Sequence, residues 1–250
     1  MKIAGVGVGS GFPCRVVAEI SNNHNGDRDR CGRLIDAATA AGADFIKFQC
    51  YSPDELVALR GDGPAPEPWG SQGWTMRSLY EKARTPFDWF PKIKAHCERV
   101  GIPWFSSVFG KESLALLESL DCPAYKIAAL DNAHDDLLDI TFATGKPVIV
   151  SGHGDEKISD FNLYCPTGYP TAFADVHLPT CFDGGLYDGL SSHCLAPELP
   201  IAAVARGCKL IEMHFMLQEE PSELESNISL TQYGFAEMIR QVRVTETLLA

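Results

Sequence analysis

The feature of this sequence that most limits its fold is a regular alternation of short apolar runs with longer helical patterns. The runs are rich in β-branched and aromatic residues and are short enough to be buried strands. Several segments between them repeat apolar residues at helical spacing and end at a glycine, as in the stripe from Cys31 to Ala38 before Gly42. Eight runs are predicted as strands: 16–20, 44–48, 102–105, 124–127, 148–150, 161–164, 186–190 and 210–213.

The alternation of strands and helices predicts a parallel sheet. Eight such units in 250 residues match the usual size of a (β/α)₈ barrel, which we predict as one domain over residues 1–250. A doubly wound open sheet is the alternative. The connections 151–161 and 170–186 look too short for a full helix, so one or two truncated crossovers are expected.

The alternating glycines Gly5, Gly7, Gly9 and Gly11 resemble a nucleotide-binding loop at first sight. A dinucleotide fingerprint needs a strand before the glycines and a helix that begins on them. Here a second strand follows instead. The segment is therefore predicted to be an N-terminal β-hairpin that plugs the closed end of the barrel.

Charge and cysteine content restrict the classes of partner and compartment. With 21 basic and 33 acidic residues, a formal charge of −12 and no basic block, the chain is a poor candidate for binding nucleic acid or an anionic membrane. Its nine scattered cysteines contain no C-x-x-C pair, which argues against disulfides and zinc–thiolate sites and predicts a reducing, cytoplasmic location. Neither a signal peptide nor a membrane span is expected.

Polar residues at the ends of the predicted strands suggest a binding site, because catalytic groups of barrels cluster there. Lys47 and Lys126 lie inside apolar runs, where a cation is costly unless it meets an anion. Together with neighbouring Ser and Asn donors they describe a site for a phosphate and a carboxylate. His193 and His214 end adjacent strands near acids and could hold Mn²⁺, Co²⁺ or Mg²⁺ through mixed N and O ligands. Any one of these residues alone is more often structural; the combination predicts the site.

Several longer motifs make the chain similar to a known family. It resembles the sialic acid synthase family, the N-acetylneuraminate synthases with their legionaminic and pseudaminic acid relatives. The motifs include AEISNNHNGD (18–27), AGADFIKFQ (41–49), SLYEKARTPFDWF (78–90), FSSVF (105–109), CPAYKIA (122–128), GKPVIVS (145–151), GYPT (168–171), GLSSH (189–193) and EMHF (212–215).

The resemblance implies a (β/α)₈ barrel and a metal-dependent transferase that forms a C–C bond. Such an enzyme condenses phosphoenolpyruvate (PEP) with the open-chain aldehyde of an N-acylmannosamine-like sugar, giving a nonulosonic acid and phosphate. The implied cofactor is a divalent metal, Mn²⁺ with Mg²⁺ or Co²⁺ as alternatives, held by His193 and His214. By the same resemblance the catalytic residues are Glu19, Lys47, Lys126 and Asp131, and the substrate-binding residues are Gln49, Ser107, Thr167, Tyr169, Ser191 and Glu225.

The chain departs from the family pattern at several of these positions. Ala129 replaces a hydroxyl, Asp131 a longer acid, Thr167 an Asn, and Glu225 an Asp. Members also carry an antifreeze-like domain that does not follow Ala250 here, so a homodimer and a separate antifreeze-like domain protein are the expected protein partners.

Three other functions remain as alternatives. The first is a diverged synthase that acts on another aldehyde. The second is a non-catalytic barrel that binds a metal or phosphate, against which the buried lysines and histidines argue. The third is a metal-dependent hydrolase, which would need a bridging carboxylate and more metal ligands. His24 and His153 are interpreted as loop residues with hydrogen-bonded rings and are not placed among the ligands.

Overall fold

The computed structural model describes all residues, 1–250, and has a closed barrel of eight parallel strands at its centre. The strands follow one another around the ring in chain order, and the last one pairs with both its predecessor and the first. The predicted (β/α)₈ barrel is therefore confirmed, and the open sheet is excluded. The barrel strands are β3 (Arg15–Glu19), β4 (Phe45–Cys50), β5 (Trp104–Val108), β6 (Tyr125–Ile127), β7 (Val148–Gly152), β8 (Phe161–Tyr164), β9 (Gly189–Ser192) and β10 (Leu210–Met216).

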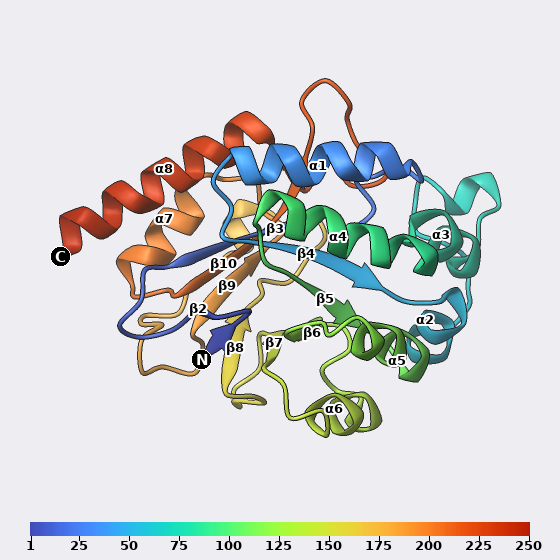
Figure 1. Ribbon diagram of the computed structural model, residues 1–250, viewed down its shortest axis with the longest axis horizontal. Helices are drawn as coiled ribbons and strands as arrows, with labels where there is room; N and C mark the ends of the chain where they lie inside the picture. Colours follow the sequence, from blue (N-terminus) through green and yellow to red (C-terminus); the bar gives the residue numbers. More distant parts are fainter.

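Helices cover the outside of most of the barrel (Figure 1). Pro91 lies in the first turn of its helix, as its missing N–H and fixed φ favour. None of the helices combines the length and apolar character needed to cross a membrane. The helices are α1 (Arg28–Ala40), α2 (Pro53–Arg60), α3 (Met76–Ala83), α4 (Phe90–Val100), α5 (Lys111–Ser119), α6 (Asp135–Phe142), α7 (Glu198–Ala205) and α8 (Gln232–Leu249).

The N-terminal segment forms the predicted hairpin from β1 (Lys2–Ile3) and β2 (Val6–Gly7), which pair antiparallel. Ile3 is fully buried in the main hydrophobic core. The carbonyl of Gly7 accepts a hydrogen bond of 3.0 Å from Arg15 Nε, so the hairpin lies at the amino end of β3. The alternating glycines thus serve this turn and open no helix.

Two crossovers are truncated, as predicted. No helix lies between β7 and β8, and a single 3₁₀ turn, η3 (Phe173–Asp175), lies between β8 and β9. A short ninth parallel strand, β11 (Ser229–Thr231), extends the sheet beside the end of β10. The loop of residues 217–228 between them projects from the body of the molecule (Figure 1).

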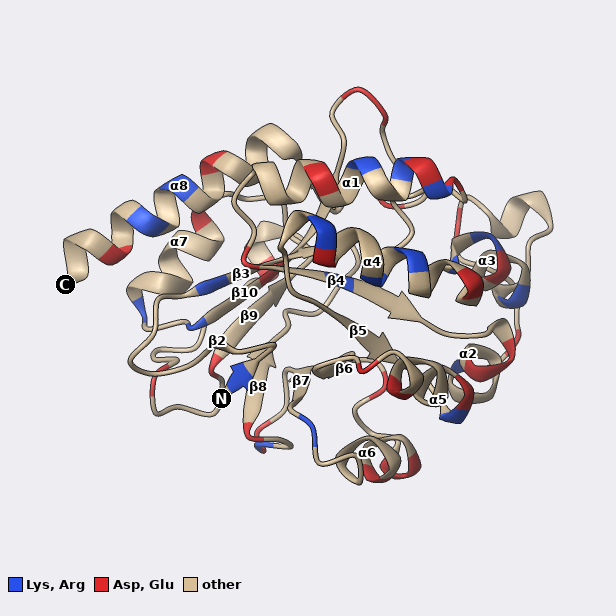
Figure 2. Cartoon of the chain, viewed as in Figure 1, with Lys and Arg blue, Asp and Glu red and all other residues tan.

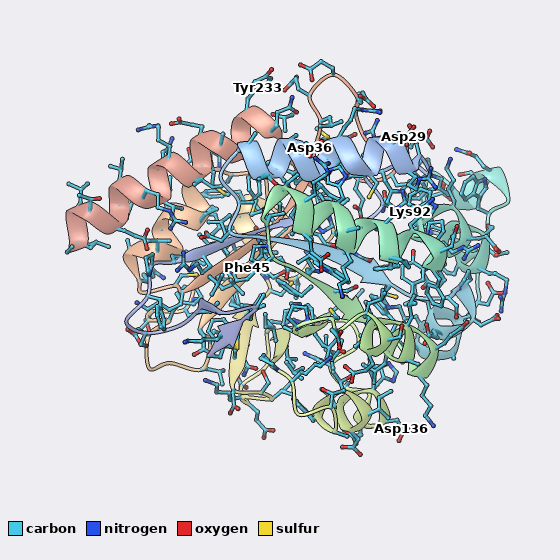
Figure 3. All side chains as sticks on the ribbon, viewed as in Figure 1. Asp29, Asp36, Phe45, Lys92, Asp136 and Tyr233 are labelled. Atoms are coloured by element: carbon cyan, nitrogen blue, oxygen red, sulfur yellow. The ribbon has the colours of Figure 1, made fainter.

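The strand arrows of β4 and β5 point toward α2 and α3, which mark the carboxyl end of the barrel (Figure 1). Charged residues of both signs cover the outer helices, and further charged segments lie among the barrel strands (Figure 2). Figure 3 shows the same division: Asp36 and Asp136 lie on α1 and α6, on the outside, whereas Phe45 lies among the strands. Charges inside the barrel need a specific explanation, because burying them is costly.

Candidate active site

Strand register alone brings the predicted polar residues side by side at the carboxyl end of the barrel. Glu19 of β3 is level with Lys47 of β4 on one side and with His214 of β10 on the other. Other polar residues are also direct neighbours on adjacent strands. These neighbouring pairs are Gln49 with Ser107, Ser107 with Lys126, and Ser191 with Glu212.

Lys47 is the centre of a buried ionic network. Its Nζ lies 2.7 Å from Glu19 Oε2 and 3.5 Å from Glu212 Oε1, and it donates to Ser107 Oγ at 3.1 Å. Burial alone would lower the pKa of Lys47, but the two carboxylates outweigh it and raise that pKa. Lys47 is therefore a permanent cation held by two acids.

Lys126 has no such counter-ion, although it is just as buried. Its Nζ donates to Ser151 Oγ at 2.5 Å and to the carbonyl of Ile127 at 3.2 Å, and no carboxylate lies within ion-pair distance. Burial, with a contribution from the charge of Lys47, lowers the pKa of Lys126. A buried ammonium with only neutral oxygen partners is an open position for an anionic ligand.

The two buried glutamates differ in their affinity for a proton. Burial raises the pKa of Glu19 despite the opposing charge of Lys47. Burial would also raise the pKa of Glu212, but Lys126 and Lys47 outweigh it and lower that pKa. Glu212 Oε1 accepts from Ser191 Oγ at 3.0 Å, whereas Oε2 is buried without a hydrogen-bond partner. Glu212 is thus a fixed anion, and Glu19 is the acid better able to exchange a proton.

Two imidazoles face each other beside this network. The ring centroids of His193 and His214 lie 5.2 Å apart, and the ring of Tyr169 lies 4.6 Å from that of His193. Burial lowers the pKa of His193 to about 3, so this ring is neutral at physiological pH. Nδ1 of His193 lies 4.0 Å from Cys165 Sγ, and Nε2 of His193 forms no hydrogen bond. Nδ1 of His214 lies 3.1 Å from Glu225 Oε2.

This donor set bears on the predicted metal. No group of three or more His, Cys, Asp or Glu side chains is arranged to hold an ion. The imidazoles of His193 and His214, the second backed by the carboxylate of Glu225, nevertheless fit a divalent cation whose other ligands are water and substrate oxygens. Burial alone would lower the pKa of His214, but the charge of Glu225 outweighs it and raises that pKa, so a bound cation would displace a proton from this ring. The same donor set is too small for the two-metal centre that a hydrolase would need.

Three further predicted residues differ in their relation to this network. Gln49 donates to Glu19 Oε1 at 3.2 Å and therefore belongs to the network. Thr167 is exposed on the loop after β8. Asp131 is fully buried, but both of its oxygens accept from Arg60 of α2, at 2.8 Å from Nε and 2.6 Å from Nη2. With its oxygens engaged in this way, Asp131 is suited to holding Arg60 in place.

Four side chains at the site were absent from the predicted set: Ser21, Arg60, Ser151 and Glu212. Strand period two places Glu212 on the face of His214, and Ser151 ends a predicted strand, so both could have been found from the sequence. Ser21 has a left-handed backbone (φ 47°) and accepts from Gln49 at 2.9 Å, a strained position of the kind found at functional sites. Arg60 gives no strand-end signal, because it lies at the end of a helix.

The turn after β3 is fixed by His24. This fully buried ring accepts the N–H of Gly26 at Nδ1 (3.0 Å) and therefore donates from Nε2 to Thr85 Oγ1 (3.1 Å). Its ring also packs edge-on against Trp89, with centroids 5.2 Å apart. The interpretation of His24 as a hydrogen-bonded loop residue agrees with this geometry, which joins the first strand end to the segment before α4.

Comparison with known proteins places the whole chain. The NeuB family matches residues 34–250. The chain is 34% identical to the pseudaminic acid synthase of Campylobacter jejuni over 94% of its own length and 74% of that protein, and 31% identical to that of Helicobacter pylori over 92% and 74%. The crystal structure of spore coat polysaccharide biosynthesis protein SpsE from Bacillus subtilis superimposes with a TM-score of 0.81 at 27% identity, covering 100% of this chain and 72% of that one. The chain therefore belongs to the NeuB family, which confirms the resemblance to the sialic acid synthases.

Proposed function

We propose that this protein condenses PEP with an N-acylmannosamine-like aldose in the presence of a divalent metal, giving a nonulosonic acid and phosphate. The observation that carries the proposal is the buried ammonium of Lys126, which has hydroxyl and carbonyl partners but no counter-ion. A ligand with both a phosphate and a carboxylate suits this position beside Lys47, because each cation then meets an anion. Relatives named as synthases of pseudaminic acid favour this choice over a binding role.

The reaction forms a bond between the methylene carbon of PEP and the aldehyde carbon. The former aldehyde oxygen takes up a proton and becomes a hydroxyl. The oxygen of a water molecule adds to the former enol carbon, and the bond from this carbon to the phosphate oxygen breaks as the keto group forms, which releases phosphate. Lys126 and Lys47 bind the charge of PEP and of the departing phosphate, while the hydroxyls of Ser107 and Ser151 orient it. Glu19, whose pKa is raised by burial, accepts the proton of the attacking water.

The pair His193 and His214 would hold the metal, which supplies Lewis-acid polarisation of the aldehyde oxygen when bound. Mn²⁺ is the proposed ion, with Mg²⁺ and Co²⁺ as alternatives. Gln49 and Tyr169 border the same space and are suited to binding the hydroxyl and amide groups of the sugar. The most specific element of this proposal is the identity of the aldehyde, an N-acylmannosamine-like sugar.

The test is phosphate release from PEP with Mn²⁺, measured with N-acetylmannosamine and a panel of other aldoses. Release that requires both metal and sugar is expected, and it should be lost in Lys126→Met and His214→Ala. Lys94→Met is the matched control, because this lysine lies on the outside of α4 and should leave release unchanged. Absence of release with every sugar, in folded protein that binds Mn²⁺, would overturn the proposal in favour of a binding role.

A further inference from the structure

The loop of residues 217–228 places one acid, Glu225, beside the imidazole pair at the carboxyl end of the barrel. Glu225 is 5% exposed, and three donors converge on its carboxylate. Oε2 lies 3.1 Å from His214 Nδ1, while Oε1 accepts from Ser21 Oγ at 3.0 Å and from the hydroxyl of Tyr169. No other residue of this loop reaches the imidazole pair by a hydrogen bond or ion pair.

The polarity of these bonds determines where the proton of His214 lies. The hydroxyls of Ser21 and Tyr169 both donate to Oε1 of Glu225, and Oε2 faces the imidazole of His214, so the surroundings of this carboxyl group suit its ionised form. An ionised carboxylate can only accept hydrogen bonds. Nδ1 of a neutral His214 must therefore carry the hydrogen, and Nε2 must carry the lone pair.

The loop is fastened so that Glu225 is held in this position. Ser222 Oγ accepts the backbone N–H of Glu225 at 3.0 Å and so fixes the last turn of the loop. Ion pairs connect the rest of the loop to α1 and α3 on the outside of the barrel. These pairs are Glu220 with Arg30 (3.3 Å), Glu220 with Arg33 (2.7 Å), and Glu223 with Lys82 (2.8 Å).

We propose that Glu225 is a positioning residue whose carboxylate fixes the Nδ1–H tautomer of His214 and directs the Nε2 lone pair toward a divalent cation. The proposal rests on the metal site of the proposed function and reassigns Glu225 from contact with the sugar to support of a ligand. Side-chain length matters here. An aspartate at this position would end roughly 1.5 Å short, beyond hydrogen-bond distance of Nδ1.

The direct test needs neither metal nor substrate. Long-range ¹H–¹⁵N correlation spectra of ¹⁵N-histidine-labelled protein, recorded at alkaline pH where His214 is neutral, distinguish the two tautomers. We expect the Nδ1–H form in the wild type and in Glu225→Gln, whose amide oxygen can still accept. In Glu225→Ala and Glu225→Asp the fixed tautomer should be lost, although Asp keeps the charge.

The second readout is Mn²⁺ affinity by titration calorimetry. Glu225→Ala and Glu225→Asp should weaken binding by about 10- to 100-fold, as is usual for loss of a carboxylate behind a histidine ligand. Glu219→Gln is the matched control, since it removes an exposed charge from the same loop that takes no part in these ion pairs, and it should change neither readout.

The outcomes separate this inference from the proposed function. An unchanged tautomer and unchanged Mn²⁺ affinity in Glu225→Asp would overturn the inference, even in an active synthase. Conversely, the tautomer shift would support it in a protein that releases no phosphate with any sugar. Circular dichroism shows whether each variant is folded. If Glu225→Ala does not fold, the tautomer and the Mn²⁺ affinity are compared between Glu225→Gln and Glu225→Asp.

Discussion

The buried ring of His24 should make the stability of this protein depend on pH. Its Nδ1 accepts the N–H of Gly26, so protonation there would bring two donors face to face. Burial, aided by the nearby charge of Arg30, lowers the pKa of His24 to about 4 from 6.5. Between these values the unfolded chain binds a proton that the folded chain excludes, so stability falls as the pH falls.

The size of the effect follows from the two pKa values. A depression from 6.5 to about 4 corresponds to about 3.4 kcal/mol of unfolding free energy when the full window is crossed. Between pH 7 and pH 5 the unfolded state gains most of its proton and the folded state almost none, which gives a loss of about 2 kcal/mol from His24 alone. This is a large share of the stability of an ordinary domain.

The assay is urea unfolding followed by tryptophan fluorescence at several pH values. The matched variant is His24→Asn, whose side-chain oxygen can accept the N–H of Gly26 but cannot titrate. It loses the contacts of the ring with Thr85 and Trp89 at every pH, and other groups titrate equally in both proteins. The wild type should therefore lose about 2 kcal/mol more than the variant between pH 7 and pH 5. Equal losses in the two proteins would refute the reasoning.

Three further perturbations have expected outcomes. Arg60→Ala leaves the fully buried carboxylate of Asp131 unpaired and should cost about 3 kcal/mol in urea unfolding, with part of this recovered when Asp131→Ala is added; a cost for the single variant within about 0.5 kcal/mol of zero would contradict the assignment. Because burial lowers the pKa of Lys126 in the free protein, PEP affinity should fall as the pH rises into the alkaline range where this ammonium loses its proton, and PEP binding there should take up a proton, seen as buffer-dependent heats in calorimetry; alkaline heats independent of the buffer would argue against this. Glu55 accepts two backbone N–H groups at the start of α5, so Glu55→Ala should destabilise by about 1 kcal/mol, and an unchanged urea midpoint would show that the cap adds nothing.

The barrel could be predicted because its signals are local. Buried strands of a parallel sheet are short apolar runs, and all eight predicted runs lie within three residues of an observed strand at each end. The run 186–190 is shifted, because the observed strand Gly189–Ser192 ends in two polar residues, of which Ser191 donates to Glu212 in the site. Helix α2 was not predicted, since its apolar stripe is weak, although Ser52 and Glu55 carry a capping-box signal.

The site could be predicted only where strand position determines it. The five residues of this kind lie in the carboxyl-terminal parts of strands or just after them, and the barrel brings these parts together whatever the helices do; they are Glu19, Lys47, Lys126, His193 and His214. The partners Arg60 of Asp131 and Glu225 of His214 depend on the path of a helix and of a loop in three dimensions. Sequence spacing contains no information on such paths. The sequence could therefore identify Asp131 and His214 as candidate site residues, but it could not show which side chains contact them.

The closure of the ring through β10 has a consequence for synthesis on the ribosome. β3 pairs on one side with β4, which follows it closely, but on the other side with β10, from Arg15 with Leu210 to Glu19 with His214. The nascent chain therefore carries an unpaired strand edge while roughly 200 further residues are made, about 10–40 s at ordinary rates of translation. Such an edge readily pairs with other chains, so aggregation through the first strand is the hazard that this closure creates until the last barrel strand has emerged.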